Sequence, residues 1–157
     1  CIADSFMQLD FLLILRPPVE SVISLCKAEQ ISSRHALHLW IASVLRSEYL
    51  SRSYSRMVFT YQQLLESPDS ILDSCSLLWG KTFIESNSLE AKSFLKPSLY
   101  RTKSNSVKDL FLEENPDLVG LLAFADYLYG VFVRSSDDFY RDLDQSRSTW
   151  IELLAAN

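Results

Sequence analysis

The segment from Phe11 to Ser24 combines the side chains and backbone features that are needed to hold an anion. An apolar run ends at Arg16, two prolines follow, and a serine lies eight positions after the arginine, at Ser24. Arginine offers a planar fork of N–H donors that matches a phosphate. Proline suits the first position of a helix, where the N-terminal N–H groups are unpaired. We therefore predict a phosphate-binding site where a buried strand meets a helix.

Both residues of this predicted site also have a structural interpretation. Glu20 lies four positions after Arg16, so an ion pair on the first helical turn could occupy the arginine. A serine inside a helix, such as Ser24, commonly donates to a backbone carbonyl one turn earlier. We favour the anion-binding interpretation for Arg16, because an arginine that ends a buried strand before two prolines is unusual.

Three further segments follow in an order that resembles sulfotransferases that use 3′-phosphoadenosine 5′-phosphosulfate (PAPS), in particular the bacterial-type sequences. They are Leu39-Trp40 within an amphipathic stretch, residues 57–66 and residues 94–101. The resemblance covers roughly residues 8–104 and departs from the family at Gln62 and Gln63, which stand where those sequences carry an acidic pair.

The resemblance implies a role for four residues in binding the nucleotide. In the family, an arginine and a serine at the spacing of Arg16 and Ser24 bind the 3′-phosphate. Tyr61 would contact the adenine or its neighbourhood, with core packing as an equal alternative. Arg101 would give a second grip on the 3′-phosphate, although a solvated basic turn with Lys103 is the favoured interpretation of that segment. The implied reaction transfers a sulfuryl group from PAPS to a hydroxyl or amine of a small molecule or glycan.

One part of the family's active site has no counterpart in this chain. Sulfotransferases hold the 5′-phosphosulfate on an N-terminal glycine-rich loop, whereas this chain has only three glycines. Gly80-Lys81-Thr82 lacks the glycine five residues earlier, where Cys75 stands, so we predict that Gly80 ends a helix. We therefore expect the C-terminal part of a longer sulfotransferase-like protein. Neither a catalytic base nor the cation at the leaving group can be assigned, so enzymatic activity stays open.

Other polar side chains favour structural roles over metal binding or catalysis. His35 and His38 lie three positions apart, but no cysteine or carboxylate is near them at a ligand spacing, so half-buried packing is expected for His38. Four aspartates resemble a calcium loop only superficially because no central glycine is present; they are Asp137, Asp138, Asp142 and Asp144. The three cysteines are odd in number and widely spaced, which favours reduced thiols; they are Cys1, Cys26 and Cys75.

The elements that must position the site alternate between strand and helix in the first half of the chain. Leu12–Leu15 and Met57–Thr60 are predicted to be strands, and each is a continuous apolar run suited to burial on both faces. Helices are predicted after a cap at Ser32 or Ser33, from Pro68, and from Asn115. We expect an α/β fold with a partial P-loop-NTPase-like parallel sheet flanked by helices. It would form one domain over residues 1–157, with an α/β part at 1–104 and a helical extension at 105–157.

Composition limits the partners that the chain can have. The net charge of −5 and the pI of about 5.0 argue against a nucleic-acid-binding surface. The sequence contains no run of eighteen apolar residues, which would indicate a membrane span. Localisation stays open, with the cytoplasm favoured, and an unpaired sheet edge could lead to self-association. The alternative to a sulfotransferase is a non-catalytic helical interaction module or a degenerate sulfotransferase-like fragment.

Overall fold

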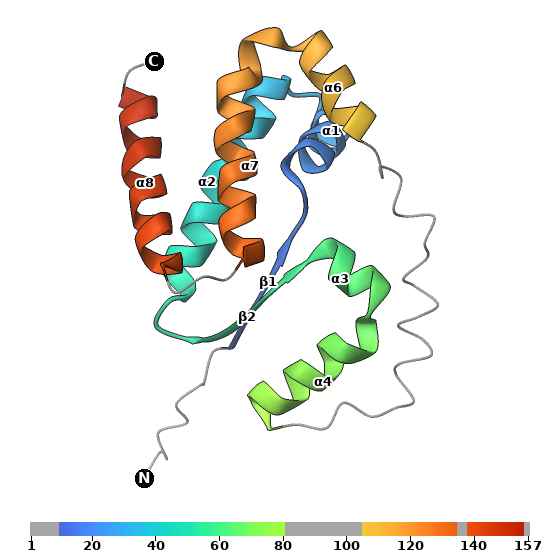
Figure 1. The fold of residues 1–157 in the computed structure, drawn as a ribbon, viewed down its shortest axis with the longest axis vertical. Coiled ribbons are helices and arrows are strands. Elements are labelled where there is room, and N and C mark those ends of the chain that lie inside the picture. Colours follow the sequence, from blue (N-terminus) through green and yellow to red (C-terminus); the bar gives the residue numbers. More distant parts are fainter. Residues whose placement is uncertain (1–9, 81–104, 135–137, 156–157) are drawn as a thin grey trace.

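The computed structural model describes residues 10–80, 105–134 and 138–155, which form a helix-rich α/β structure around two strands (Figure 1). The first half of the chain contains β1 (Asp10–Leu15), α1 (Pro18–Glu29), α2 (Ser33–Ser51), β2 (Ser55–Thr60), α3 (Tyr61–Glu66) and α4 (Pro68–Trp79). The second half contains α6 (Asn105–Glu114), a 3₁₀ turn (Pro116–Leu118), α7 (Val119–Arg134) and α8 (Phe139–Ala155). The α/β class is thus confirmed.

The two predicted strands pair in parallel, with Asp10 opposite Ser55 and Leu15 opposite Thr60. A parallel pair cannot be joined by a tight hairpin, and here α1 and α2 form the connection between the strands. Since the register is uniform, both strands end at the same edge of the sheet, and the residues that follow them begin next to one another.

The prediction that the two strands are buried on both faces was wrong. Every residue of β2 is half-buried, and β1 is open on one face. Leu12 and Ile14 are 40% and 47% exposed, whereas Leu15 is buried. Successive side chains of a strand point to opposite faces, so one face of β1 is open to solvent. Within the described residues the sheet has only two strands, and the edge of β1 away from β2 is unpaired. Continuous apolarity in a strand therefore does not by itself indicate burial on both sides.

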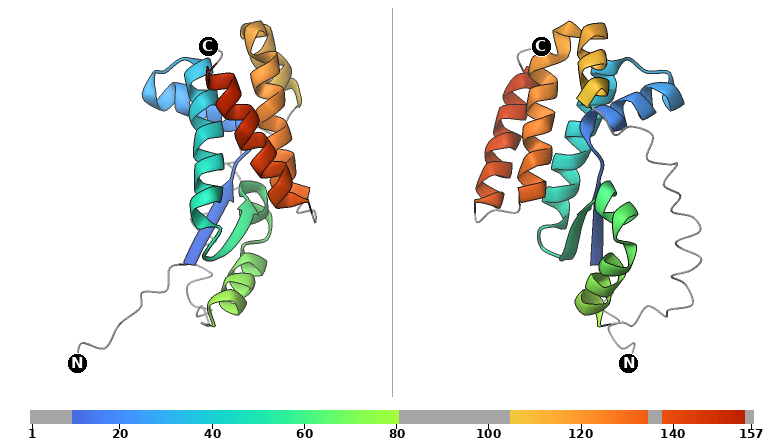
Figure 2. Two further views of the ribbon diagram at one scale, coloured as in Figure 1. Left: turned by 90° about the vertical axis from the view of Figure 1, so that its left-hand side faces the viewer. Right: turned by 45° about the vertical axis from the view of Figure 1, so that its right-hand side comes forward.

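The hydrophobic core lies mainly among α1, α2, α7 and α8, and Figure 2 shows α2, α7 and α8 running alongside one another. Large apolar side chains that are almost completely buried come from all four helices and include Val22, Leu37, Ile41, Leu122, Leu128 and Leu143. The segment Pro116–Arg134 is long and apolar enough to cross a membrane by length and composition alone. Its inward residues belong to this core, and a core helix of a globular protein meets the same criteria.

Two of the three predicted helix starts are observed, whereas the segment predicted to be helical from Asn115 begins with a 3₁₀ turn and becomes α7 only at Val119. The hydroxyl of Ser32 accepts a hydrogen bond from the His35 N–H at 3.3 Å and caps α2. Pro68 begins α4, and Gly80 ends it in the left-handed conformation, with φ of 60°. Gly80 is therefore a helix C-cap, as predicted. In α4, Ile71 and Cys75 are buried, Leu72 is half-buried and Leu78 is exposed.

Candidate anion-binding site at the carboxyl edge of the sheet

Arg16 and Tyr61, two of the predicted site residues, lie together at the edge where both strands end. Arg16 directly follows β1 and Tyr61 directly follows β2. The guanidinium carbon of Arg16 lies 5.2 Å from the centre of the Tyr61 ring, a cation–π distance. The parallel register is responsible for this meeting, because it places the residues after Leu15 and Thr60 side by side.

The backbone of Arg16 is fixed by its neighbours, and its side chain is held at one nitrogen. The indole N–H of Trp40 donates to the Arg16 carbonyl at 3.2 Å. Pro17 has φ of −52° and ψ of 141°, which turns the chain into α1 with Pro18 in its first turn. Arg16 Nε donates to Glu20 Oε2 at 3.3 Å, so the ion pair considered as the alternative is present. The terminal nitrogens make no hydrogen bond with the described residues, and the side chain is 31% exposed.

Ser24, the third predicted residue, makes no hydrogen bond with Arg16, whose side chain bonds Glu20. It is exposed on α1, four positions after Glu20 and hence on the same side of the helix. No side chain caps α1, and the Ser21 N–H is bonded to the Pro17 carbonyl at 3.1 Å. The N–H groups that precede Ser21 have no partner within the helix. Arg16, the start of α1 and Ser24 thus offer donors along one side of the helix.

The site is close to neutral, which limits how strongly it can attract a phosphate. The Glu20 carboxylate next to Arg16 offsets the charge of the guanidinium. An anion could contact the terminal nitrogens of Arg16 but would be repelled by Glu20. Arg101, the remaining predicted binding residue, and the whole segment 94–101 lie outside the described residues. Among the described residues, Arg16 is therefore the one predicted cation at this site.

Gln63 is one of the two glutamines that stand where the sulfotransferase sequences carry an acidic pair, and it has a structural role. Gln63 and Thr60 form a capping box at the start of α3, in which each side chain accepts a hydrogen bond from the other residue's backbone N–H. The two distances are 2.8 Å and 3.1 Å. This cap fixes the direction in which Tyr61 leaves the strand.

His38 is a packing residue, as predicted. Its ring centre lies 5.0 Å from a ring centre of Trp150 on α8. Burial lowers the pKa of His38, and the charges of Arg34 and His35 lower it further. The imidazole is therefore neutral at pH 7.

Two of the candidate metal and thiol residues, Asp137 and Cys1, lie outside the described residues. In residues 10–80, 105–134 and 138–155, no three His, Cys, Asp or Glu side chains are grouped so that they could hold a metal ion. Cys26 and Cys75 are free thiols on helices, and burial raises the pKa of Cys75.

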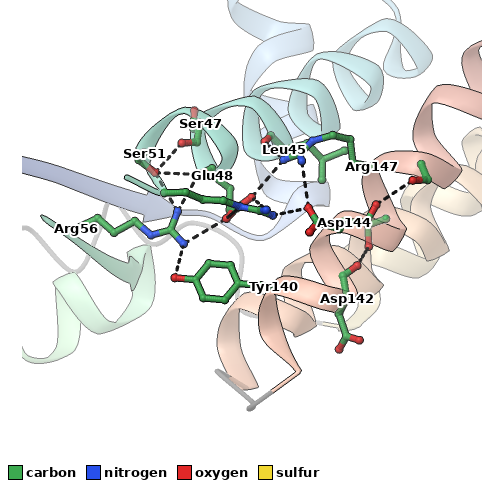
Figure 3. A network of polar contacts seen from close by, with 12 residues as sticks. Leu45, Ser47, Glu48, Ser51, Arg56, Tyr140, Asp142, Asp144 and Arg147 are labelled. Atoms are coloured by element: carbon green, nitrogen blue, oxygen red, sulfur yellow. Dashed lines mark hydrogen bonds and ion pairs between the residues drawn. The ribbon is translucent and has the colours of Figure 1, made fainter. Parts of the chain in front are cut away.

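A buried ionic network that the sequence did not reveal lies at the other end of β2 (Figure 3). Glu48 on α2 is 0% exposed and bonds three arginines. Arg52 donates to both of its carboxylate oxygens, at 2.7 Å and 3.0 Å. Arg56 and Arg147 donate to one oxygen each, at 3.2 Å and 3.3 Å. This single carboxylate joins α2, the start of β2 and α8.

An outer layer completes the network. Asp144 pairs with Arg52 at 2.8 Å and with Arg147 at 3.2 Å, and the Arg52 hydrogen bond holds the pKa of Asp144 below its usual value. The rings of Tyr49 and Tyr140 cover the guanidinium groups. The guanidinium carbon of Arg147 lies 4.1 Å from the centre of the Tyr49 ring. The spacing of Glu48 and Arg52 is a visible helical signal, but Arg147 lies 99 positions from Glu48 and only the fold brings it there.

Comparison of the chain with protein-family models, with curated proteins and with solved structures finds no match. Any function must therefore be argued from the residues and their arrangement.

Proposed function

We propose that this chain is the nucleotide-binding part of a sulfotransferase-like protein and that Arg16 binds the 3′-phosphate of PAPS. The observation that carries the proposal is the position of Arg16 beside Tyr61, after two adjacent parallel strands, with 5.2 Å between the guanidinium carbon and the ring centre. Nucleotides bind α/β proteins at the carboxyl ends of the strands. The sequence resemblance assigns the same two residues to the same ligand.

Four features at or near this edge suit a phosphorylated nucleoside. The terminal nitrogens of Arg16 can donate two parallel hydrogen bonds to a phosphate, while Glu20 holds the Nε side of the fork. The start of α1 lacks a side-chain cap and favours negative charge. The Tyr61 ring gives a surface on which a base can stack. Ser24, exposed on α1, adds a hydroxyl donor for a phosphate that reaches along the helix.

The part of the reaction that these residues support is binding and orientation of the donor. PAPS itself supplies the sulfuryl group that moves to the acceptor hydroxyl or amine. Holding the 3′-phosphate fixes the nucleotide and so fixes where the 5′-phosphosulfate can lie, which is the positioning component of catalysis. The base and the cation at the leaving group are not assigned to any residue of this chain.

Calorimetric titration of adenosine 3′,5′-bisphosphate into the full chain tests the proposal. We expect binding that weakens at least about tenfold in Arg16→Ala, as expected for the loss of a charge-assisted hydrogen-bonded contact. Adenosine 5′-monophosphate, which lacks the 3′-phosphate, should bind similarly weakly to both proteins. Arg46→Ala, at an exposed arginine of α2, is the matched control and should bind as the unaltered chain does.

Two results would contradict the proposal. One is equal bisphosphate binding by the unaltered chain and Arg16→Ala. The other is no binding by a chain whose circular dichroism shows the expected helices. The latter would favour a helical interaction module, for which α8 offers Ile151 and Leu154, 59% and 51% exposed and three positions apart on one side of the helix.

A further inference from the structure

The open face of β1 carries opposite charges at its two ends, so two copies in antiparallel orientation would place opposite charges next to each other. Because side chains alternate along a strand, Asp10, Leu12 and Ile14 of β1 belong to one face. Arg16, the residue directly after the strand, is the next position in this alternation. Asp10 is exposed and forms no ion pair with the described residues, and the two apolar residues are about half exposed. An acid thus begins this row, a base ends it, and two aliphatic side chains lie between them.

The backbone edge beside this face is also open. Within the described residues, β1 pairs only with β2, so its other edge has no strand partner. A groove of about 550 Å³ follows this strand, lined by the five consecutive residues 12–16 and by exposed side chains of α2 that include Leu39, Ser43 and Ser47. Natural edge strands are usually protected by a charge, a proline or a bulge, and β1 has none of these between its ends.

We propose that a second copy of this chain pairs with the open edge of β1 in antiparallel orientation, with the two-fold axis at Leu13. In this register Asp10 of each copy faces Arg16 of the other, and Leu12 of each copy faces Ile14 of the other. Opposite charges and aliphatic pairs placed directly across strands stabilise a sheet. A parallel in-register pairing would instead place Asp10 against Asp10 and Arg16 against Arg16, which is unfavourable.

The result is a closed two-fold dimer with a continuous four-stranded sheet in the order β2, β1, β1, β2. The same patch is used by both copies, as a two-fold interface requires. The contact is confined to one short strand per copy, and interfaces below about 1,200 Å² are typically weak. The dimer should therefore depend on protein concentration in the micromolar range. Arg16 can hold Glu20 and the second copy's Asp10 together, since a guanidinium has five N–H donors.

Sedimentation velocity over the micromolar range, with charge reversals at the two ends of β1, tests the pairing. We expect a monomer–dimer equilibrium for the unaltered chain and dimerisation at least about tenfold weaker for Asp10→Arg and for Arg16→Asp, because each reversal creates two like-charge pairs. An equimolar mixture of the two variants should dimerise again, since each copy then meets an opposite charge at both ends. Asp109→Arg, on the exposed side of α6, is the control with the same charge change and should behave as the unaltered chain.

Three results would overturn this inference. The first is an unaltered chain that stays monomeric throughout the concentration range. The second is a dimer whose dissociation constant is unchanged in both charge-reversal variants, and the third is a mixture of the variants that stays monomeric. Circular dichroism of each variant checks that it has folded. The inference does not depend on nucleotide binding, because Asp10→Arg leaves Arg16, Ser24 and Tyr61 in place. A chain that dimerises without binding the bisphosphate would remove the proposed function alone.

Discussion

At the scale of single residues, the Arg16 guanidinium contacts two groups and has nitrogens left to bind an anion. Its Nε already binds Glu20, its guanidinium lies over Tyr61, and its terminal nitrogens make no hydrogen bond with described residues. The bond to Glu20 restricts the rotation of a long side chain, which lowers the entropy lost when an anion binds. The same carboxylate repels that anion. Whether the ordering of Arg16 or the repulsion of the anion is larger can be measured, because a substitution can remove the charge of Glu20 and keep its hydrogen-bond acceptor.

Glu20→Gln is expected to tighten the binding of adenosine 3′,5′-bisphosphate by about fivefold. A unit charge about 4 Å away contributes about 1 kcal/mol in water, and the glutamine carbonyl can still accept from Arg16 Nε. Calorimetric titration at low salt measures the change, and it should shrink at high salt because exposed charges are then screened. Glu66→Gln, at an exposed position of α3, is the matched control. Weaker binding by Glu20→Gln would mean that the ion pair mainly orients Arg16.

At the scale of elements, Glu48 is the point where three separated segments are held together. It bonds Arg52 within α2, Arg56 at the start of β2 and Arg147 on α8. Among the described residues, these three guanidinium groups share two carboxylates, those of Glu48 and Asp144. Such a buried network adds little net stability over apolar packing, but removing one member leaves charges unpaired. It therefore specifies how α8 sits against α2.

Glu48→Gln is expected to lower the free energy of unfolding by about 3 kcal/mol, because three partly buried arginines lose their central counter-charge. Urea denaturation followed by circular dichroism measures this change. Glu152→Gln, at an exposed position of α8, removes the same charge and should change stability by less than about 0.5 kcal/mol. Equal stability of the two variants would show that the arginines do not depend on Glu48.

At the scale of the whole molecule, the packing of α8 on α2 makes the stability of the fold depend on pH. His38 on α2 lies against Trp150 on α8, and burial lowers its pKa in the folded state. As the pH falls through about 6.5, the unfolded chain takes up a proton at this histidine before the folded chain does. The stability associated with neutral His38 is therefore present above about pH 6.5 and is lost as the pH falls toward the lower folded pKa.

The melting temperature of the unaltered chain should thus fall between about pH 7 and pH 5, and His38→Gln should reduce this fall. His35→Gln should keep most of it, because His35 is exposed on the same helix. Calorimetric scans at several pH values measure all three proteins. An identical pH dependence in His38→Gln would assign the effect to other groups.

The local elements could be predicted from the sequence: two strands, a helix cap at Ser32 or Ser33, the Gly80 cap and the proline that starts α4. These follow from backbone preferences and hydrophobic periodicity, which act over a few residues. It also placed Arg16 and Tyr61 each directly after a strand. A parallel sheet was also predicted, but the tertiary structure alone decided the register that brings these two side chains together. It also decided that one face of β1 is open and that Arg147 reaches Glu48. Such contacts join residues about 45 to 100 positions apart, and the free energy that selects them comes from burying whole helix faces rather than from any short segment.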